Sequence, residues 1–280
     1  MGDHGLLPPD SVARRVDREM FLLGGGAAAL LMQVAHPLVA AGVDQHSDFR
    51  RSPHRRLLRT LDTTLAIVFG DMRHAIGAVD RINARHVPVH GASATGIPYS
   101  ARDPRLLLWV QCTLILTSLR LYELVMGRLS AGDRQRYWDE GKLIAARLGI
   151  PGRLMPETIG DLEAYEREML ASEVIPDETS RAVGRDVIRP YRFLPGAATW
   201  PIDALTAGLL PPSLREPFGL RWGAAERLAY RAAIVSLRYA RVALPERLTV
   251  VPQARAWEAR SGGYSPASPP LATVSPAREG

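Results

Sequence analysis

The stretch MFLLGGGAAALLMQVAHPLVAAGV, from Met20 to Val43, decides how the chain is interpreted. Its 24 residues contain no Asp, Glu, Lys or Arg, and a helix of this length is long enough to cross a bilayer. Three consecutive glycines, Gln33, His36 and Pro37 all lower its tendency to insert. Small residues also let another helix approach closely in a soluble core, as they do in lipid. We therefore expect a buried core helix here.

The rest of the chain has helical periodicity in its apolar residues, and no alternating strand pattern of useful length is present. Helices are predicted at about 10–34, 54–85, 103–127, 131–148, 158–173, 178–188, 201–209 and 222–243. Asp103 before Pro104 is typical of a helix start, and Ser130 with Asp133 resembles a capping box. Leu194-Pro-Gly196 predicts a stop.

Length and composition favour one globular all-α domain. The 280 residues are 46% hydrophobic and 23% charged, with no repeat and no mid-chain linker. We expect a flexible N-terminus at 1–9, a helical domain at 10–260 and a disordered tail at 261–280, which is rich in Pro, Ser, Gly and Ala. Because Cys112 is the only cysteine and no signal peptide is recognisable, a soluble cytoplasmic protein is predicted.

The formal net charge of +6 raises the question of a nucleic-acid partner. Almost all basic residues are arginines, and the densest cluster, from Arg50 to Arg59, has no aromatic residue after Phe49. A nucleic-acid surface combines clustered cations with interleaved aromatics, so no nucleic-acid partner is expected. Peripheral membrane contact stays open, because an enzyme acting on apolar substrates can touch a bilayer. The sequence also leaves the oligomeric state open.

All seven histidines lie in the first ninety residues, at His4, His36, His46, His54, His74, His86 and His90. Histidine is the commonest ligand for transition metals and heme, so this half of the chain is where a metal or cofactor site is expected. The sequence contains no Glu-x-x-His, no His-Glu-x-x-His, no dinucleotide-binding glycine motif, no Walker loop and no Gly-x-Ser-x-Gly. A single cysteine also excludes a cysteine-based zinc or iron–sulfur site.

Two consecutive stretches bring polar groups beside apolar helix faces. Arg56, Arg59 and Thr60 fall at positions i, i+3 and i+4, so two guanidiniums and a hydroxyl are expected to project together. Further along, His86 stands in INARHVPVHG, where the helix must end near Pro88. His86 is therefore expected on a last helical turn, facing a cavity beyond the helix end.

Short blocks of residues follow one another in a fixed order through the first half of the chain. They are Leu22-Leu-Gly-Gly-Gly26 with Gln33-Val-Ala-His36-Pro37, His46-Ser-Asp-Phe49, Arg56-Leu-Leu-Arg59-Thr60, Val68-Phe-Gly70, His86-Val-Pro-Val-His90-Gly91, Tyr99 with Asp103-Pro104, and Trp109-Val-Gln-Cys-Thr113. In this order the chain resembles the MpaB and rubber-oxygenase (latex clearing protein) catalytic-domain family, as a bacterial member. Tyr137-Trp138 and Leu148-Gly-Ile-Pro151 extend the resemblance.

The resemblance implies an all-α domain of the rubber-oxygenase type with one heme b between its helices. It implies an oxidoreductase that uses dioxygen or peroxide on an apolar small molecule, isoprenoid or lipid-like. Carried over by position, the proximal ligand of the iron falls on His86, and the pocket group falls on Arg56, Arg59 and Thr60. The arginines would pair with the propionates, and Thr60 or Thr113 would donate a hydrogen bond to bound oxygen.

The chain departs from the family pattern at three positions. Arg59 replaces a lysine, and because a guanidinium does not release its proton, an acid–base role at this position is put in doubt. His90 stands where rubber oxygenases carry a second arginine, and Gln111 stands where many relatives have a histidine.

Other interpretations of these residues stay open. His36 and His90 compete with His86 as the iron ligand, and His36 fits equally a core histidine at a helix break. Arg56 and Arg59 also fit ion pairs with Asp62 or other carboxylates. At the level of function, the alternative is a non-catalytic helical carrier that holds heme or lipid without turnover.

Overall fold

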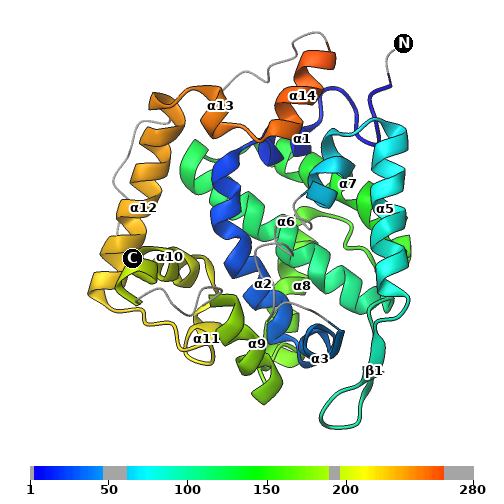
Figure 1. Ribbon diagram of the computed structural model, residues 1–280, viewed down its shortest axis with the longest axis vertical. Helices are drawn as coiled ribbons and strands as arrows, with labels where there is room; N and C mark the ends of the chain where they lie inside the picture. The colour runs from blue at the N-terminus through cyan, green and yellow to red at the C-terminus, as the bar shows by residue number, and fades with distance from the viewer. Residues whose placement is uncertain (1–2, 47–61, 189–195, 262–280) are drawn as a thin grey trace.

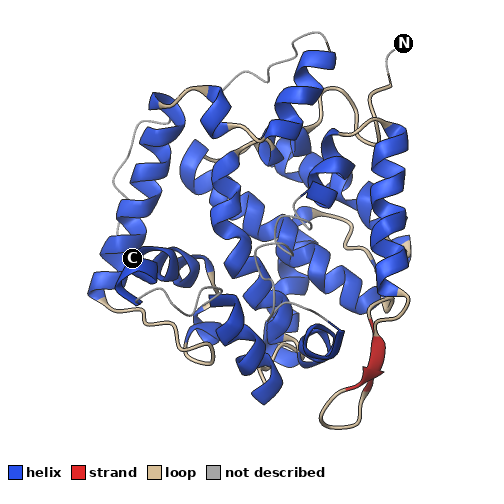
Figure 2. Ribbon diagram, in the orientation of Figure 1, coloured by secondary structure: helices blue, strands red, loops and turns tan. Residues whose placement is uncertain are grey.

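The computed structural model describes residues 3–46, 62–188 and 196–261, and within them helices dominate (Figures 1 and 2). The elements in chain order are α1 (Val12–Asp17), η1 (Met20–Gly25), α2 (Gly26–Ala35), α3 (Pro37–His46), α5 (Met72–His86), β1 (His90–Ala92), β2 (Pro98–Ser100), α6 (Pro104–Met126), α7 (Ala131–Arg147), η3 (Gly152–Leu154), α8 (Ile159–Ser172), α9 (Glu178–Ile188), α10 (Gly196–Leu209), α11 (Pro212–Arg215), α12 (Ala224–Ala243), α13 (Glu246–Thr249) and α14 (Pro252–Arg260). The two strands form one antiparallel hairpin. The predicted all-α fold class is confirmed.

Helix α6 is the central element of the core. Its predicted start is confirmed, since the Asp103 carboxylate accepts the backbone N–H of Arg105 at 2.8 Å and Pro104 occupies the first turn. The helix ends at Gly127, whose φ of 96° favours glycine. In Figure 1, α2 crosses in front of α6, and the indole N–H of Trp109 donates to the carbonyl of Met32 on α2 at 3.2 Å.

The predicted helix at 10–34 is wrong, because the chain leaves helical conformation between α1 and η1. Two buried charged residues at this point hold distant partners. The Glu19 carboxylate accepts two hydrogen bonds from the guanidinium of Arg241, at 2.5 and 3.1 Å. The guanidinium of Arg18 donates to the Glu258 carboxylate at 2.9 Å. The carbonyl of Arg18 also accepts from the backbone of Val251. The bond from Val251 occupies the Arg18 carbonyl, which a continuing helix would need as an acceptor, and the side-chain bonds anchor both residues at the break.

Two of the three consecutive glycines, Gly24 and Gly25, pack closely against other helices, as expected for small residues. A Cβ on Gly24 would lie 3.2 Å from the side chain of Leu205 on α10. A Cβ on Gly25 would lie 3.3 Å from Leu121 and Thr117 on α6. Gly26 has open space beside it, since a Cβ there would meet no atom within 4 Å. The close approach of η1 to α6 and α10 therefore depends on the first two glycines.

The apolar stretch that begins at Met20 does not form one straight helix. Its two halves, Met20–Ala35 and Pro37–His46, meet at an angle of 106°. Among the described helices, α6 alone is long and apolar enough to cross a membrane, and the bent pair would make a second candidate if it counted as one span. Inside the structure 67% of the most apolar window of α6 is buried, which is what a core helix of this composition shows.

The predicted helix at 54–85 is interrupted at Gly70, and its residues 54–61 lie outside the described part. Residues 62–69 are helical, and α5 then begins anew. Asp71 caps α5, because its carboxylate accepts the backbone N–H of His74 at 2.8 Å and contacts the ring of His74 at 2.7 Å. The Asp71-x-x-His74 pair therefore starts a helix.

The N-terminal residues expected to be flexible pack onto the domain from residue 3 onward. The side chain of Leu7 is 1% exposed. Arg14 holds this segment, since its guanidinium donates to the carbonyls of Pro8 and Val68 at 2.7 and 2.9 Å. It also stacks on the indole of Trp257, 4.2 Å from the ring centroid, on the unpredicted helix α14. The tail expected at 261–280 lies, from residue 262, outside the described residues.

Helix α10 also differs from its prediction. It starts at Gly196, so the Leu194-Pro-Gly196 stop precedes a helix, and Pro201 lies inside it. The ring of Tyr230 on α12 packs directly against Gly208, where a Cβ would come within 2.2 Å of the ring. Only a glycine lets α10 and α12 approach this closely.

Candidate functional site

His86 is the last residue of α5, as its position before Pro88 predicts. It lies on the same face of the helix as Ala75 and Val79, which are buried, and Ile82, which packs against the cluster that contains Val79. The His86 side chain is half-buried, and within the described part of the chain no hydrogen bond or ion pair to its ring is found. Burial lowers the pKa of His86, which favours the neutral imidazole.

The hairpin that follows His86 is fastened to α3. The hydroxyl of Tyr99 on β2 donates to Gln45 Oε1 at 2.7 Å, and the amide of Gln45 donates to the carbonyl of Ala92 at 2.9 Å. Gly91 lets these groups meet, because a Cβ there would lie 2.9 Å from the Gln45 oxygen and 3.0 Å from the Tyr99 hydroxyl. The end of α5 is thereby positioned relative to α3.

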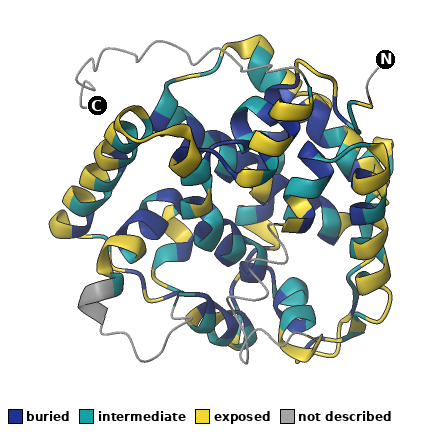
Figure 3. Cartoon of the chain, turned by 45° about the horizontal axis from the view of Figure 1, so that its top comes forward, coloured by how far each residue is buried: buried dark blue, intermediate teal, exposed yellow. Residues whose placement is uncertain are grey.

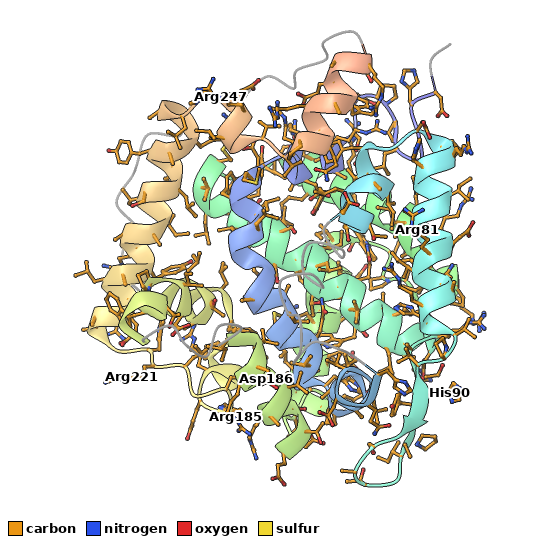
Figure 4. The ribbon with its side chains drawn as sticks, in the orientation of Figure 1. Arg81, His90, Arg185, Asp186, Arg221 and Arg247 are labelled. Atoms are coloured by element: carbon orange, nitrogen blue, oxygen red, sulfur yellow. The ribbon has the colours of Figure 1, made fainter. Side chains whose placement is uncertain are left out.

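His90 is the first residue of β1 in this hairpin. Its side chain is exposed, and Figure 4 places it at the outer edge of the molecule. Its backbone carbonyl lies 3.1 Å from Nε2 of His46, the last residue of α3. The contribution of His90 to the described structure is therefore through its backbone.

His36 occupies the break between α2 and α3 and is 4% exposed. Its ring Nδ1 accepts the backbone N–H of Leu38 at 3.2 Å, and its Nε2 lies 3.6 Å from a carboxylate oxygen of Glu173. Burial lowers the pKa of His36, while the Glu173 carboxylate opposes that shift. Both ring nitrogens of His36 thus face protein groups.

Thr113 and Gln111 lie on α6, both buried. The Thr113 hydroxyl donates to the carbonyl of Val110 one turn earlier at 2.8 Å, so its proton is already used inside the helix. The Gln111 amide is 3.5 Å from the carbonyl of Gly141 on α7. In the described part of the chain, the Thr113 hydroxyl thus bonds within α6, and the Gln111 amide bonds from α6 to α7.

The predicted group of Arg56, Arg59 and Thr60 lies outside the described residues. Its position relative to His86 therefore stays a prediction. Asp62, the carboxylate considered as a partner of these arginines, lies at the edge of the described part. Its Oδ1 accepts a hydrogen bond from the amide of Gln253 on α14 at 3.0 Å.

An exposed apolar residue in the middle of α6 was not singled out from the sequence. Leu114 is 39% exposed although the residues on either side of it are buried. Leu107 and Val110, at i−7 and i−4, share its helix face and are half-buried. The spacing of these three residues is visible in the sequence, but their incomplete burial is not.

Among the described residues, no group of three or more His, Cys, Asp or Glu side chains is arranged to hold a metal ion. A heme iron needs only one protein imidazole on its proximal side, which is a different requirement. The ring of His86 is half-buried and has no hydrogen-bond partner within the described ranges.

The described part of the chain is an all-helical domain, and a half-buried histidine, His86, ends its helix α5. Residues 13–239 match the family described as ER-bound oxygenase mpaB/B'/Rubber oxygenase, catalytic domain, and the chain belongs to this family. The curated relatives include an uncharacterised protein of Mycobacterium bovis and one of Mycobacterium tuberculosis. Each is 26% identical to this chain over 252 residues, which cover 84% of this chain and 94% of the relative.

Proposed function

We propose that this protein is a heme b-dependent oxygenase that acts on an apolar small molecule, isoprenoid or lipid-like. The observation that carries the proposal is His86, a half-buried histidine at the end of α5 whose ring has no partner among the described residues, in a chain of the oxygenase family. A neutral imidazole with a free nitrogen is what a heme iron requires of its proximal ligand.

Comparison of the three candidate histidines supports His86 over the other two. The ring nitrogens of His36 face the backbone N–H of Leu38 and the Glu173 carboxylate, so binding iron would break a buried contact. The ring of His90 is exposed on a hairpin, where an iron site would be open to water. We therefore assign the proximal position to His86.

Bound heme would supply an iron centre that reacts with dioxygen or peroxide. The chain's own residues would hold it and exclude water. We propose that Arg56 neutralises a propionate and that Arg59 donates hydrogen bonds, because a guanidinium keeps its protons at neutral pH. Since the Thr113 hydroxyl donates to Val110, we assign hydrogen-bond donation in the pocket to Thr60 in place of Thr113.

The experiment that tests this function measures heme content and turnover in the same preparation. The purified protein, reconstituted with hemin if needed, should show a Soret band, and it should consume dioxygen or peroxide when squalene is added as an apolar probe. A protein with a Soret band but no turnover on any isoprenoid or fatty-acid probe would support the non-catalytic carrier. A colourless protein that does not bind hemin would contradict both.

The cytoplasmic location and the lack of a nucleic-acid partner stay predictions.

A further inference from the structure

Helix α12 exposes an apolar stripe that no described element covers. Leu228, Ala232, Val235, Tyr239 and Val242 follow one another at intervals of four and three residues, so they lie on one face. Leu228 is 69%, Tyr239 72% and Val242 62% exposed. Figure 1 shows α12 on the left flank of the molecule, and Figure 3 shows exposed residues recurring along its length.

The stripe cannot turn inward, because the opposite face of α12 is already committed to the core. Ile234 is buried there, and Leu237 and Tyr230 pack against the same cluster. The guanidinium of Arg238 donates to the carbonyl of Leu124 on α6 at 2.6 and 2.8 Å, and Arg241 pairs with the buried Glu19. The helix is thus apolar on two faces and fixed in rotation.

Two more exposed apolar residues follow α12 in the sequence. Leu244 and Leu248 follow it and are 44% and 55% exposed, with Arg247 exposed between them. Isolated exposed apolar residues are ordinary, but a run of large ones along one helix and in the residues that follow it marks a contact surface. We call Leu228, Val235, Tyr239, Val242, Leu244 and Leu248 the α12 face.

Positive charge borders the α12 face. Arg227 and Arg231 lie along one side of the stripe, and no ion pair to either is formed within the described residues. Figure 4 places Arg221 near the beginning of α12 and Arg247 beyond its end. From Arg221 to Arg260 the chain has eight arginines and three glutamates.

The three glutamates of this region already have partners. The Glu226 carboxylate caps α12, accepting the backbone N–H of Gly223 at 2.8 Å. Glu258 and Glu246 lie 2.9 and 3.3 Å from the guanidinium of Arg18. The charge available at the α12 face is therefore cationic.

This charge decides between two occupants of the face. A second copy of the chain, pairing through the same stripe, would bring the bordering arginines of the two copies together, with no carboxylate on the described face to separate them. An anionic lipid surface instead accepts apolar side chains into its acyl boundary and pairs its headgroups with the bordering arginines. An exposed tyrosine such as Tyr239 suits the boundary between headgroups and acyl chains.

We propose that the α12 face docks this protein peripherally on an anionic lipid bilayer. The apolar side chains enter the boundary region, and Arg227, Arg231 and Arg247 contact the anionic headgroups. This docking does not depend on the heme or on His86. It would bring an enzyme for apolar substrates to the phase in which such substrates are dissolved.

Vesicle flotation of the full-length protein tests the proposal. The probes are phosphatidylcholine vesicles with about 30 mol % phosphatidylglycerol and vesicles of phosphatidylcholine alone. The double variant Leu228→Glu/Tyr239→Glu should lower the partition coefficient on anionic vesicles about tenfold or more, because it removes apolar area and adds negative charge. Arg227→Gln/Arg231→Gln should weaken binding to anionic vesicles and leave the small affinity for neutral vesicles unchanged.

The matched control is Leu143→Glu/Ile175→Glu, which makes the same change at two exposed apolar residues of α7 and of the loop between α8 and α9. It should float like the wild type. Circular dichroism checks that all variants are folded. The proposal is overturned if the wild type stays with neither vesicle, or if the α12 variant floats like the control. A dimer in light scattering that only the α12 variant dissociates would also overturn it, in favour of a second copy.

Discussion

The Nδ1 atom of His36 accepts the backbone N–H of Leu38 at 3.2 Å, across the break at which α2 gives way to α3. This is the bond that a capping side chain makes at the start of a helix, where the first backbone N–H groups have no helical acceptor. His36 therefore stabilises the 106° turn between the two helices.

A substitution of His36 should affect stability and leave heme binding unchanged. His36→Ala removes the acceptor for Leu38 and should lower the free energy of unfolding by about 1–2 kcal/mol, whereas His36→Asn keeps an acceptor and should cost less. Urea unfolding measures the difference, and the absorption spectrum of each variant should match that of the wild type. If His36→Asn abolishes the Soret band at full folding, His36 is the ligand and the assignment to His86 is wrong.

Glu140 on α7 is predicted to be a main support of α1. Its carboxylate accepts from the Ser11 hydroxyl at 2.7 Å and from the backbone N–H groups of Val12 and Ala13 at 3.1 and 2.7 Å. Glu140→Ala leaves these buried donors without an acceptor and should cost about 2–4 kcal/mol of unfolding free energy. The control Asp139→Ala, on the exposed side of α7, should stay within about 0.5 kcal/mol of the wild type. Equal effects would show that the capping contact contributes little.

The pH dependence of stability should reflect Asp17. Burial raises the pKa of its carboxyl from 3.8 to about 7, opposed by the hydrogen bond from Tyr137 and aided by the nearby Glu140. The folded state then holds a proton that the unfolded chain releases near pH 4, so this group lowers the free energy of unfolding as the pH rises from about 4 to about 7. Asp17→Asn, which keeps an acceptor for Tyr137, should flatten that decline in urea titrations at several pH values. An unchanged slope would assign the decline to other groups.

Two glycine substitutions should act with opposite signs. In Gly208→Ala the new methyl would overlap the ring of Tyr230, so the ring or the two helices must shift, at a cost of about 1–3 kcal/mol. In Gly26→Ala the methyl enters open space in a helix and should stabilise the protein by up to about 1 kcal/mol. Thermal unfolding of both variants compares them directly. A Gly208→Ala protein as stable as the wild type would mean that the contact between Gly208 and Tyr230 does not constrain the two helices.

Elements bounded by local signals are predicted closely from the sequence. Helix α7 is expected at 131–148 and spans Ala131–Arg147, because Ser130 caps it through its own side chain. Helix α8 is expected at 158–173 and spans Ile159–Ser172, with Thr158 and Asp161 forming a reciprocal cap. In both, the groups that begin the helix lie within a few residues of it.

Elements that depend on distant partners were not predictable in this way. The break after α1 is associated with the bond between Glu19 and Arg241, which are 222 residues apart in the sequence. At the candidate site, the end of α5 at His86 follows from Pro88, which is local. The engagement of His36 by Glu173 required the packed structure, because Glu173 lies far from His36 in the sequence. The roles of Arg56, Arg59 and Thr60 stay predictions.

The most direct test of the heme assignment is the absorption spectrum of His86→Ala compared with His74→Ala, both reconstituted with hemin. His74 is a suitable control because its ring is exposed and bonded to Asp71 at the start of the same helix. The wild type and His74→Ala should show the same Soret band, and His86→Ala should lose it or shift it, with the band partly restored by added imidazole. An identical Soret band in all three proteins would contradict the assignment of His86 as the iron ligand.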